Sequence, residues 1–472
     1  MTTSLWRNTQ YVLWLISDTS KGLSQTLFAF AIPLIALIVT NDPAQAGVIG
    51  GLGMATRVAL TIVGGVLADR HRRIALMVLG SGVGIVLSAA FTLLALGDAL
   101  TFGVLLVLDV LLAARTGLFD TAGEAALKDI VAPETMGRAM AANQARDAAM
   151  QLAGGPLGGA LLVVGGWFVG AVMTLGHLVA AATAWLIPRV RGAGTDAAQG
   201  EAETGSEAGA VGGAAAGTGA VVGTDAVAGT DAGPEPVEQN GDAAGAASAP
   251  SRSALREIRE GFSWLFSRPD LRGVLIVLTL INLGINTAIT TVIYALQQDG
   301  RSPAVIGWMS AGLGVTMLIG AVGASWIVTR VGAGVLLCAG LIALTVGGAT
   351  VTLVREPLGV VLVLAVPGLL LAPLNAALGG YGMVATPTGL VGRVNSAWAV
   401  FGMGALPLAP LIAGFGLSLA GRTDTILIGA AICAVAAVLA VSQRPLRSLP
   451  AEAGWQGHAR QFESAEPVDV RR

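Results

Sequence analysis

Residues 46–96 read AGVIGGLGMATRVALTIVGGVLADRHRRIALMVLGSGVGIVLSAAFTLLAL, which is two apolar runs separated by the charged stretch ADRHRR. Each run is roughly 20 residues long, the length that an α-helix needs to cross the ~30 Å hydrocarbon core of a bilayer. Charged side chains enter that core only at a high cost, so the stretch between the runs belongs in a loop at the membrane surface. The segment therefore predicts a helical hairpin that crosses a membrane twice.

Apolar runs of similar length recur along the whole chain. Hydrophobic residues make up 54% of its 472 residues and charged residues only 12%, against roughly 25% charged residues in an ordinary soluble domain. We therefore predict an all-α polytopic membrane protein with about twelve transmembrane helices, six on each side of a central interruption. The predicted helices lie at about 11–39, 46–68, 74–96, 101–122, 143–165 and 167–187, and at about 271–296, 304–328, 333–354, 357–380, 395–419 and 424–443.

The central interruption divides the chain into regions. Residues 191–250 contain almost no large apolar side chain, so they cannot bury enough surface to offset their ordering entropy and are predicted to form a disordered cytoplasmic linker. Residues 251–270 place apolar side chains on one helical stripe and arginines elsewhere, as in an amphipathic helix at a membrane surface. The predicted regions are thus helices in 1–190, the linker 191–250, the amphipathic helix 251–270, further helices in 271–445 and a cytoplasmic tail, 446–472.

The positions of Lys and Arg predict the orientation. Basic loops stay on the cytoplasmic side of a membrane, and with alternating helices nearly all basic residues fall on one side, which leaves Arg301, Arg355 and Arg422 for the other. We therefore expect both termini and the linker in the cytoplasm and the protein in the cell membrane. The first apolar stretch is too long for the core of a signal peptide, so we expect it to remain as the first helix.

Composition also argues against several classes of function. The net charge is −2 and no basic cluster is interleaved with aromatic residues, so we expect no nucleic-acid partner. Cys338 and Cys433 lie within apolar runs, as packing residues do. The three histidines are scattered, and the chain has no Ser/His/Asp grouping and no GxxxxGK[ST] loop for ATP. We therefore expect no enzyme activity, no metal site and no cofactor.

The charged loop of the first hairpin resembles the signature of the major facilitator superfamily, Gly-x-x-x-Asp-Arg followed by basic residues. The positions that match are Gly65, Asp69, Arg70 and Arg73, whereas Arg72 and Ile74 depart from the pattern. This resemblance implies two six-helix bundles around a central cavity. Physically, the glycine allows close helix packing, and the charges can form a cytoplasmic latch that breaks when the conformation changes. The alternative is a basic loop that only sets the orientation.

The predicted fourth and fifth helices extend the resemblance. Arg115, with Gly117 close behind, is similar to the family's buried arginine in helix 4. The fifth helix is similar to the Gly/Pro-rich helix of exporters in this family, through Gly154, Gly155, Pro156, Gly158 and Gly159. Such a run permits close backbone contact and a hinge, or else only ordinary packing of small residues. The connection between these helices and the amphipathic helix resemble most the branch that contains enterobactin exporters and macrolide efflux proteins.

Ionisable residues inside membrane helices are costly and are therefore candidates for function. Asp18 and Arg115 each lie about seven residues from the cytoplasmic end of a helix, so we expect them to pair and protonation of Asp18 to release Arg115. The alternative partner of Asp18 is Lys21, one turn further along. Arg57 and Asp109 form a second candidate pair near mid-membrane, either functional or purely structural.

The second helical region offers polar side chains and few charges. Asn282 and Asn286 lie one turn apart, and Asn375 follows Pro373 in a later helix. These amides are candidates for a substrate cavity or, alternatively, for hydrogen bonds between helices. We therefore expect the coupling chemistry in the N-terminal region and a permissive, apolar cavity wall in the C-terminal region.

Together these features predict a secondary active transporter. The preferred hypothesis is proton-coupled efflux of amphipathic small molecules, of a drug or siderophore type, by alternating access. The expected partners are a small-molecule substrate, protons and the lipid bilayer, and the protein is expected to be a monomer. The alternatives are a nutrient importer or facilitator, a lipid flippase, and a non-transporting membrane sensor of the same fold.

Overall fold

The computed structural model describes residues 5–198, 262–387, 390, 394, 398 and 401–462, and among these it contains helices and no strand. In the described part of the chain, twelve helices are long and apolar enough to cross a membrane. The predicted linker lies outside the described residues except for its first part, because the sixth helix continues to Ala198. Only residues 262–270 of the predicted amphipathic segment are described, and they are helical from 262 to 267.

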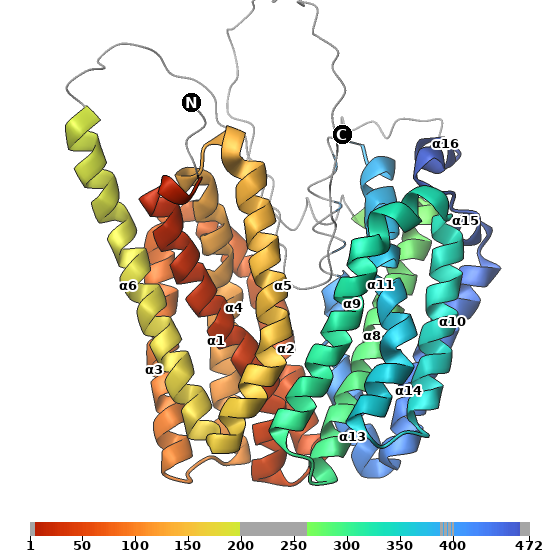
Figure 1. The fold of residues 1–472 in the computed structure, drawn as a ribbon, viewed down its shortest axis with the longest axis horizontal. Coiled ribbons are helices and arrows are strands. Elements are labelled where there is room, and N and C mark those ends of the chain that lie inside the picture. The colour runs from red at the N-terminus through yellow and green to blue at the C-terminus, as the bar shows by residue number, and fades with distance from the viewer. Residues whose placement is uncertain are drawn as a thin grey trace, which may run out of the picture.

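Six long helices form the N-terminal half (Figure 1). They are α1 (Thr9–Thr40), α2 (Pro43–Arg70), α3 (Arg73–Leu96), α4 (Phe102–Ile130), α5 (Pro133–Val164) and α6 (Gly166–Ala198). Their connections are short, and the side chains of Asn8, Asp42 and Thr101 cap the N-termini of α1, α2 and α4. At α2, Asp42 accepts a hydrogen bond from the amide of Ala44, and Pro43 occupies the first turn.

The C-terminal half repeats this pattern. Its helices are α8 (Pro269–Gln298), α9 (Pro303–Arg330), α10 (Ala333–Val351), α11 (Pro357–Ala385), α13 (Leu408–Leu419) and α14 (Gly421–Ser442), and the membrane span that contains α13 runs over Phe401–Leu419. The predicted fold class, an all-α protein with twelve membrane helices in two six-helix bundles, is confirmed.

Helices 4 and 5 extend well beyond their predicted bounds. The apolar runs end near residue 122 and begin near residue 143, but α4 continues to Ile130 and α5 begins at Pro133. The added turns are rich in Ala, Glu, Met and Arg, which favour helix without being apolar enough for the membrane core. Hydropathy marks the membrane core and therefore underestimates helices that project past it.

The two halves meet at one end of the molecule. We call the end that contains Pro43, Pro303 and Gly421 the closed end, and the opposite end, where α1 begins and α14 ends, the terminus end (Figure 1). At the closed end α2 packs against α13 and α5 against α9, and one buried apolar cluster includes residues of both halves. At the terminus end each half has its own separate cluster. Among the described residues, the buried apolar cluster that joins the halves therefore lies at the closed end.

A short segment after α14 covers the terminus end of the C-terminal half. This C-terminal cap consists of α15 (Arg444–Arg447), η3 (Glu452–Gly454) and α16 (Trp455–Arg460). The amides of Ala333 and Gly334 at the start of α10 donate to the carbonyls of Pro450 (3.1 Å) and Leu449 (3.0 Å). The described part of the predicted tail is therefore packed against the helices.

Candidate transport site between the two halves

A network of charged side chains connects α1, α4 and α5 in the N-terminal half. Asp18 Oδ1 lies 2.8 Å from Lys21 Nζ, and Asp18 Oδ2 lies 2.9 Å from Arg146 Nη2. Asp120 Oδ1 lies 3.6 Å from the same lysine and 3.8 Å from Arg115 Nη1. All five side chains are at least largely buried. We call these five residues the charged network.

The predicted direct pair of Asp18 and Arg115 is not formed, and this corrects the expectation from depth alone. The two residues are connected through Lys21 and Asp120 instead, and Arg115 Nε donates to the carbonyl of Gly80 on α3 at 2.9 Å. Lys21 follows Asp18 by one turn on the same helix, so it reaches the carboxylate without bridging two helices.

Sequence reasoning gave Arg146 no role, although the residue lies within the predicted fifth helix, 143–165, and within α5. Its guanidinium lies over the ring of Trp14, 5.7 Å from the centroid, while the indole Nε1 of Trp14 donates to the carbonyl of Gly123 at 2.8 Å. Gln25 adds a hydrogen bond to Asp120.

The second predicted pair, Arg57 and Asp109, is also not formed. No cation lies within salt-bridge distance of the Asp109 carboxylate among the described residues, and its Oδ2 is buried without a hydrogen-bond partner. The carboxylate packs against Gly53 of α2, one turn before Arg57, where a Cβ would collide with Oδ2. The close packing of α2 on α4 thus aligns Asp109 with a glycine and not with the arginine.

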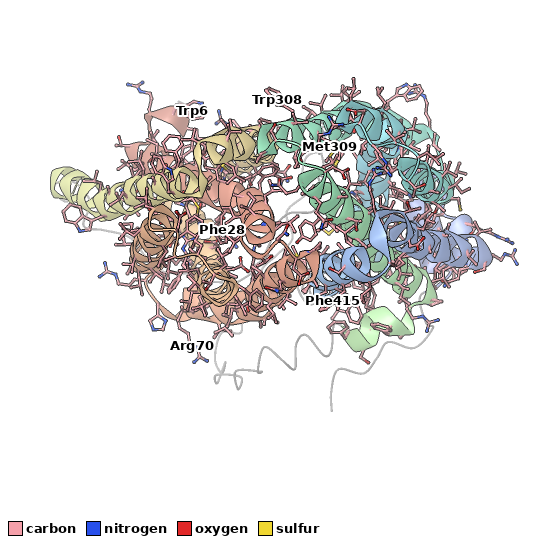
Figure 2. All side chains as sticks on the ribbon, turned by 90° about the horizontal axis from the view of Figure 1, so that it is seen from below. Trp6, Phe28, Arg70, Trp308, Met309 and Phe415 are labelled. Carbon is pink, nitrogen blue, oxygen red and sulfur yellow. The ribbon has the colours of Figure 1, made fainter. Side chains whose placement is uncertain are left out.

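The predicted latch residues lie at the terminus end of α2. Asp69 and Arg70 are exposed, and Arg70 points away from the N-terminal half (Figure 2). A Cβ at Gly65 would meet nothing within 4 Å. Arg73 alone is engaged, with Asp129 at 2.9 Å and the carbonyl of Ala125 at 3.0 Å, both in the same half. No contact of the described residues joins these side chains to the C-terminal half.

The glycine run of α5 faces two different helices. A Cβ at Gly154 or Gly158 would collide with or press on side chains of α1, whereas Gly155 and Gly159 lie against α9 of the other half. A Cβ at Gly155 would lie 2.8 Å from the carbonyl oxygen of Gly307. With Pro156 inside the helix, the run forms one of the places where the halves meet, as the view along the helices also indicates (Figure 2).

Among the described residues, no hydrogen bond joins the predicted amides of the C-terminal half into one group. Asn286 is exposed and donates to the carbonyl of Asn282 at 2.8 Å, along its own helix, and Asn375 is half-buried on α11. Next to the first two residues lies a pocket between α8, α9, α10, α11 and α14. Its lining is almost entirely apolar and includes Ile285, Leu313, Met317, Leu364, Leu371 and Cys433. We call it the apolar pocket.

Known proteins with a similar sequence pattern or a similar fold are membrane transporters. The model of the Major Facilitator Superfamily matches residues 19–405. A bacterial homologue of the human lysosomal transporter Spinster, solved in an inward-facing and unoccupied conformation, is 15% identical, with 98% of each chain covered and a TM-score of 0.60. A bacterial homologue of the iron transporter ferroportin in an inward-facing state is also 15% identical, with 93% of this chain and 99% of that chain covered and a TM-score of 0.62.

An auto-inhibited peptide transporter of the POT family is 14% identical, with 98% of each chain covered and a TM-score of 0.59. At such low sequence identities, the structural similarity establishes a shared fold but not a shared substrate. A comparison with curated proteins finds no match. The family model covers most of the membrane helices of this chain, and the solved structures share its whole architecture. The chain is a multi-pass membrane protein and belongs to the major facilitator superfamily.

Proposed function

We propose that this transporter exports amphipathic small molecules by proton-coupled alternating access. The observation that carries the proposal is the contrast between the halves: the N-terminal half holds the charged network, and the C-terminal half holds the apolar pocket. A substrate with one apolar and one polar end would find a suitable surface on each side. The glycine run of α5, which resembles that of exporters, favours efflux over uptake.

The proposed orientation puts the terminus end in the cytoplasm. Basic residues gather at that end, as the positive-inside rule expects. The closed end then faces outward, and the conformation is inward-facing, like those named for two of the structural neighbours. In this state the predicted latch is open, which agrees with the exposure of Asp69 and Arg70 and with the free space beside Gly65.

Asp18 is the proposed coupling carboxylate of the charged network. It holds two cations, Lys21 from its own helix and Arg146 from α5. Protonation of Asp18 would remove both ion pairs at once and weaken the contact between α1 and α5, whose glycine run also touches α9. A single proton would thereby act on a helix of the N-terminal half that contacts the C-terminal half.

The apolar pocket also favours a second candidate, a lipid flippase. Thr316 and Cys433 are among its few polar side chains, and the lining carries no charge, which suits an acyl chain as well as an aromatic ring. A flippase would move a fluorescent phospholipid and leave soluble dyes where they are. An importer would instead raise the cellular level of its substrate, and a sensor of the same fold would bind a ligand without flux.

The first test is retention of fluorescent amphipathic dyes and a catechol siderophore in efflux-deficient cells, with and without a protonophore. The variants are wild type, Asp18→Asn and the control Asp98→Asn, which changes an exposed aspartate in a left-handed conformation that Asn also accepts. We expect cells that express wild type or the control variant to retain less of the compound than efflux-deficient cells without the protein. Cells that express Asp18→Asn, or wild type in the presence of the protonophore, should retain as much as cells without the protein. Unchanged retention of every compound in wild type would overturn the proposal.

A further inference from the structure

Asp109 is a buried acid that the charged network does not use. It lies about seven residues into α4, roughly 10 Å from the closed end of that helix, and only 5% of its surface is exposed. Leu105, Leu108 and Leu112 surround it on its own helix and are buried as well. Its Oδ2 has no hydrogen-bond partner. An isolated carboxylate is unstable in such surroundings, whereas the uncharged acid needs only one acceptor.

Tyr294 brings a second unpartnered polar group to the same place from the other half. It lies near the closed end of α8, its exposed fraction is 0%, and its hydroxyl has no hydrogen-bond partner. A Cβ at Gly50 would lie 3.9 Å from the Tyr294 Oη. The carboxyl of Asp109 rests against Gly53, one turn further along the same helix. Two glycines of α2 therefore make room for an acid from α4 and a hydroxyl from α8.

Both groups are sealed by the contact between the halves. Tyr294, Ile49 and Leu105 belong to the buried cluster that crosses from one half to the other at the closed end. Beside Gly50, Pro410 of α13 closes the gap, with a distance of 3.3 Å from its Cβ to a Cβ placed at the glycine. Separation of the halves at this end would give water access to the carboxyl.

We propose that Asp109 is a proton-binding site of the closed end and that Tyr294 is its positioning partner from the opposite half. The protonated acid donates its hydrogen to a water that the tyrosine hydroxyl also binds, and this bridge keeps the halves together. Loss of the proton to water leaves a carboxylate that needs hydration, so the closed end opens. The inference rests on the proposed function in one respect, that proton binding drives the conformational cycle.

The charged and titratable groups around Asp109 determine whether a rise or a fall in pH opens the closed end. Tyr294 is the titratable group that faces it from α8, and Arg57 is the nearest charge on α2, one turn toward the terminus end and outside salt-bridge distance. With no cation to hold the ionised form, a rise in pH acts through deprotonation and opens the closed end. A fall in pH closes it.

The test measures opening directly, without any substrate. Spin labels are placed at Ala99 and Leu353, in exposed connections at the closed end of the two halves, after replacement of Cys338 and Cys433. Distances between the labels are measured by pulsed electron resonance on the full chain in lipid nanodiscs from pH 5 to pH 9. In wild type we expect the long-distance population to grow with pH.

Three variants test the assignment. Asp109→Asn should stay at the short distance over the whole range, because the amide is always uncharged. Tyr294→Phe should open at a pH lower by about 0.5–1 unit, because it removes only the hydrogen-bond acceptor. Asp424→Asn, at an exposed aspartate of the same end, should behave like wild type, and an elution profile like that of wild type establishes that each variant is folded.

The outcomes separate this inference from the proposed function. If Asp109→Asn opens with pH as wild type does, or if Tyr294→Phe leaves the midpoint unchanged, the assignment is wrong even where efflux is driven by protons. If the three variants behave as expected while no dye or siderophore is exported, the proton site stands and the export proposal falls.

Discussion

Gly123 shows how closely the charged network is fitted to its surroundings. A Cβ at this position would lie 2.9 Å from Asp18 Oδ1 and 3.3 Å from Lys21 Nζ. We expect Gly123→Ala to displace the ion pair and to lower the free energy of unfolding by about 1–3 kcal/mol. Gly137→Ala is the matched control: it lies within α5 with nothing within 4 Å and should stabilise the protein by up to ~1 kcal/mol.

Thermal unfolding in detergent measures both variants, and dye efflux reports on the network. Equal stability and equal efflux of Gly123→Ala and wild type would show that the charges tolerate displacement.

His458 gives the C-terminal cap a dependence on pH. Its Nδ1 is 3.0 Å from the hydroxyl of Tyr381, which donates to Asp270 at 2.6 Å, and its Nε2 is 3.3 Å from Ser448 Oγ. Burial lowers the pKa of His458, although the Asp270 carboxylate acts in the opposite direction. The docked imidazole therefore binds a proton less readily than a free one, so docking is strongest above about pH 6.5 and weakens as the pH falls below it.

We expect proteolysis of the cap to become faster as the pH is lowered from 8 to 5, measured with a protease active over that range. His458→Gln has no imidazole to titrate and should be cleaved at a rate that does not follow pH. A cleavage rate in wild type that is flat from pH 8 to 5 would contradict the assigned role of this histidine.

At the scale of elements, the two glycine contacts of α2 and α5 should affect the conformations in opposite directions. Gly155 is pressed against α9 in the present conformation, with 2.8 Å between a Cβ and the Gly307 carbonyl oxygen, whereas Gly65 has free space. We expect Gly155→Val to favour the conformation in which the two halves are separated at the closed end. Gly65→Val should favour the present conformation, because the added side chain obstructs only the packing that the proposed latch requires.

Labelling of a cysteine at the closed end by a water-soluble maleimide measures both shifts. Gly82→Val is the control, since this glycine of α3 also has nothing within 4 Å and no proposed role in either contact. Labelling that changes equally in all three variants would indicate a general loosening of the helices and not a shift between conformations.

Sequence alone predicted the number and the type of the elements, because membrane helices are defined by apolar length and that signal is local. It placed Asp18 and Asp109 among the functional candidates for the same reason, since charge inside an apolar run stands out. It named Lys21 only as the alternative partner of Asp18 and did not predict Arg146, because a sequence does not show which side chains of two helices face each other. Gly53 rather than Arg57 meets Asp109 because of how α2 packs on α4. Tyr294 is unremarkable in sequence, and only the contact between halves gives it a role.

At the scale of the whole molecule, the single shared core at the closed end implies that the two halves move as bodies about their contacts. Ala44 on α2 and Ser418 on α13 lie at one such contact, where the amide of Ala44 donates to Ser418 Oγ at 3.2 Å. In a variant without Cys338 and Cys433, we expect the pair Ala44→Cys and Ser418→Cys to form a disulfide on oxidation and to stop transport, with recovery on reduction.

Each single cysteine variant is the control and should transport normally under both conditions. Full transport by the oxidised double variant, with the disulfide verified by mass spectrometry, would remove alternating access as the mechanism.

The contact between Arg268 and the C-terminal cap has a consequence for how the chain can be divided. Arg268 precedes α8 and forms a bidentate ion pair with Asp270, at 3.0 and 2.9 Å, while its Nη2 also donates to the carbonyl of Ala459 at 3.0 Å. The beginning and the end of the C-terminal half are thereby fastened to each other. A gene cut between the codons for residues 199 and 261 should therefore yield two polypeptides that each retain their own helices and associate through the closed end, so the covalent connection becomes dispensable for assembly.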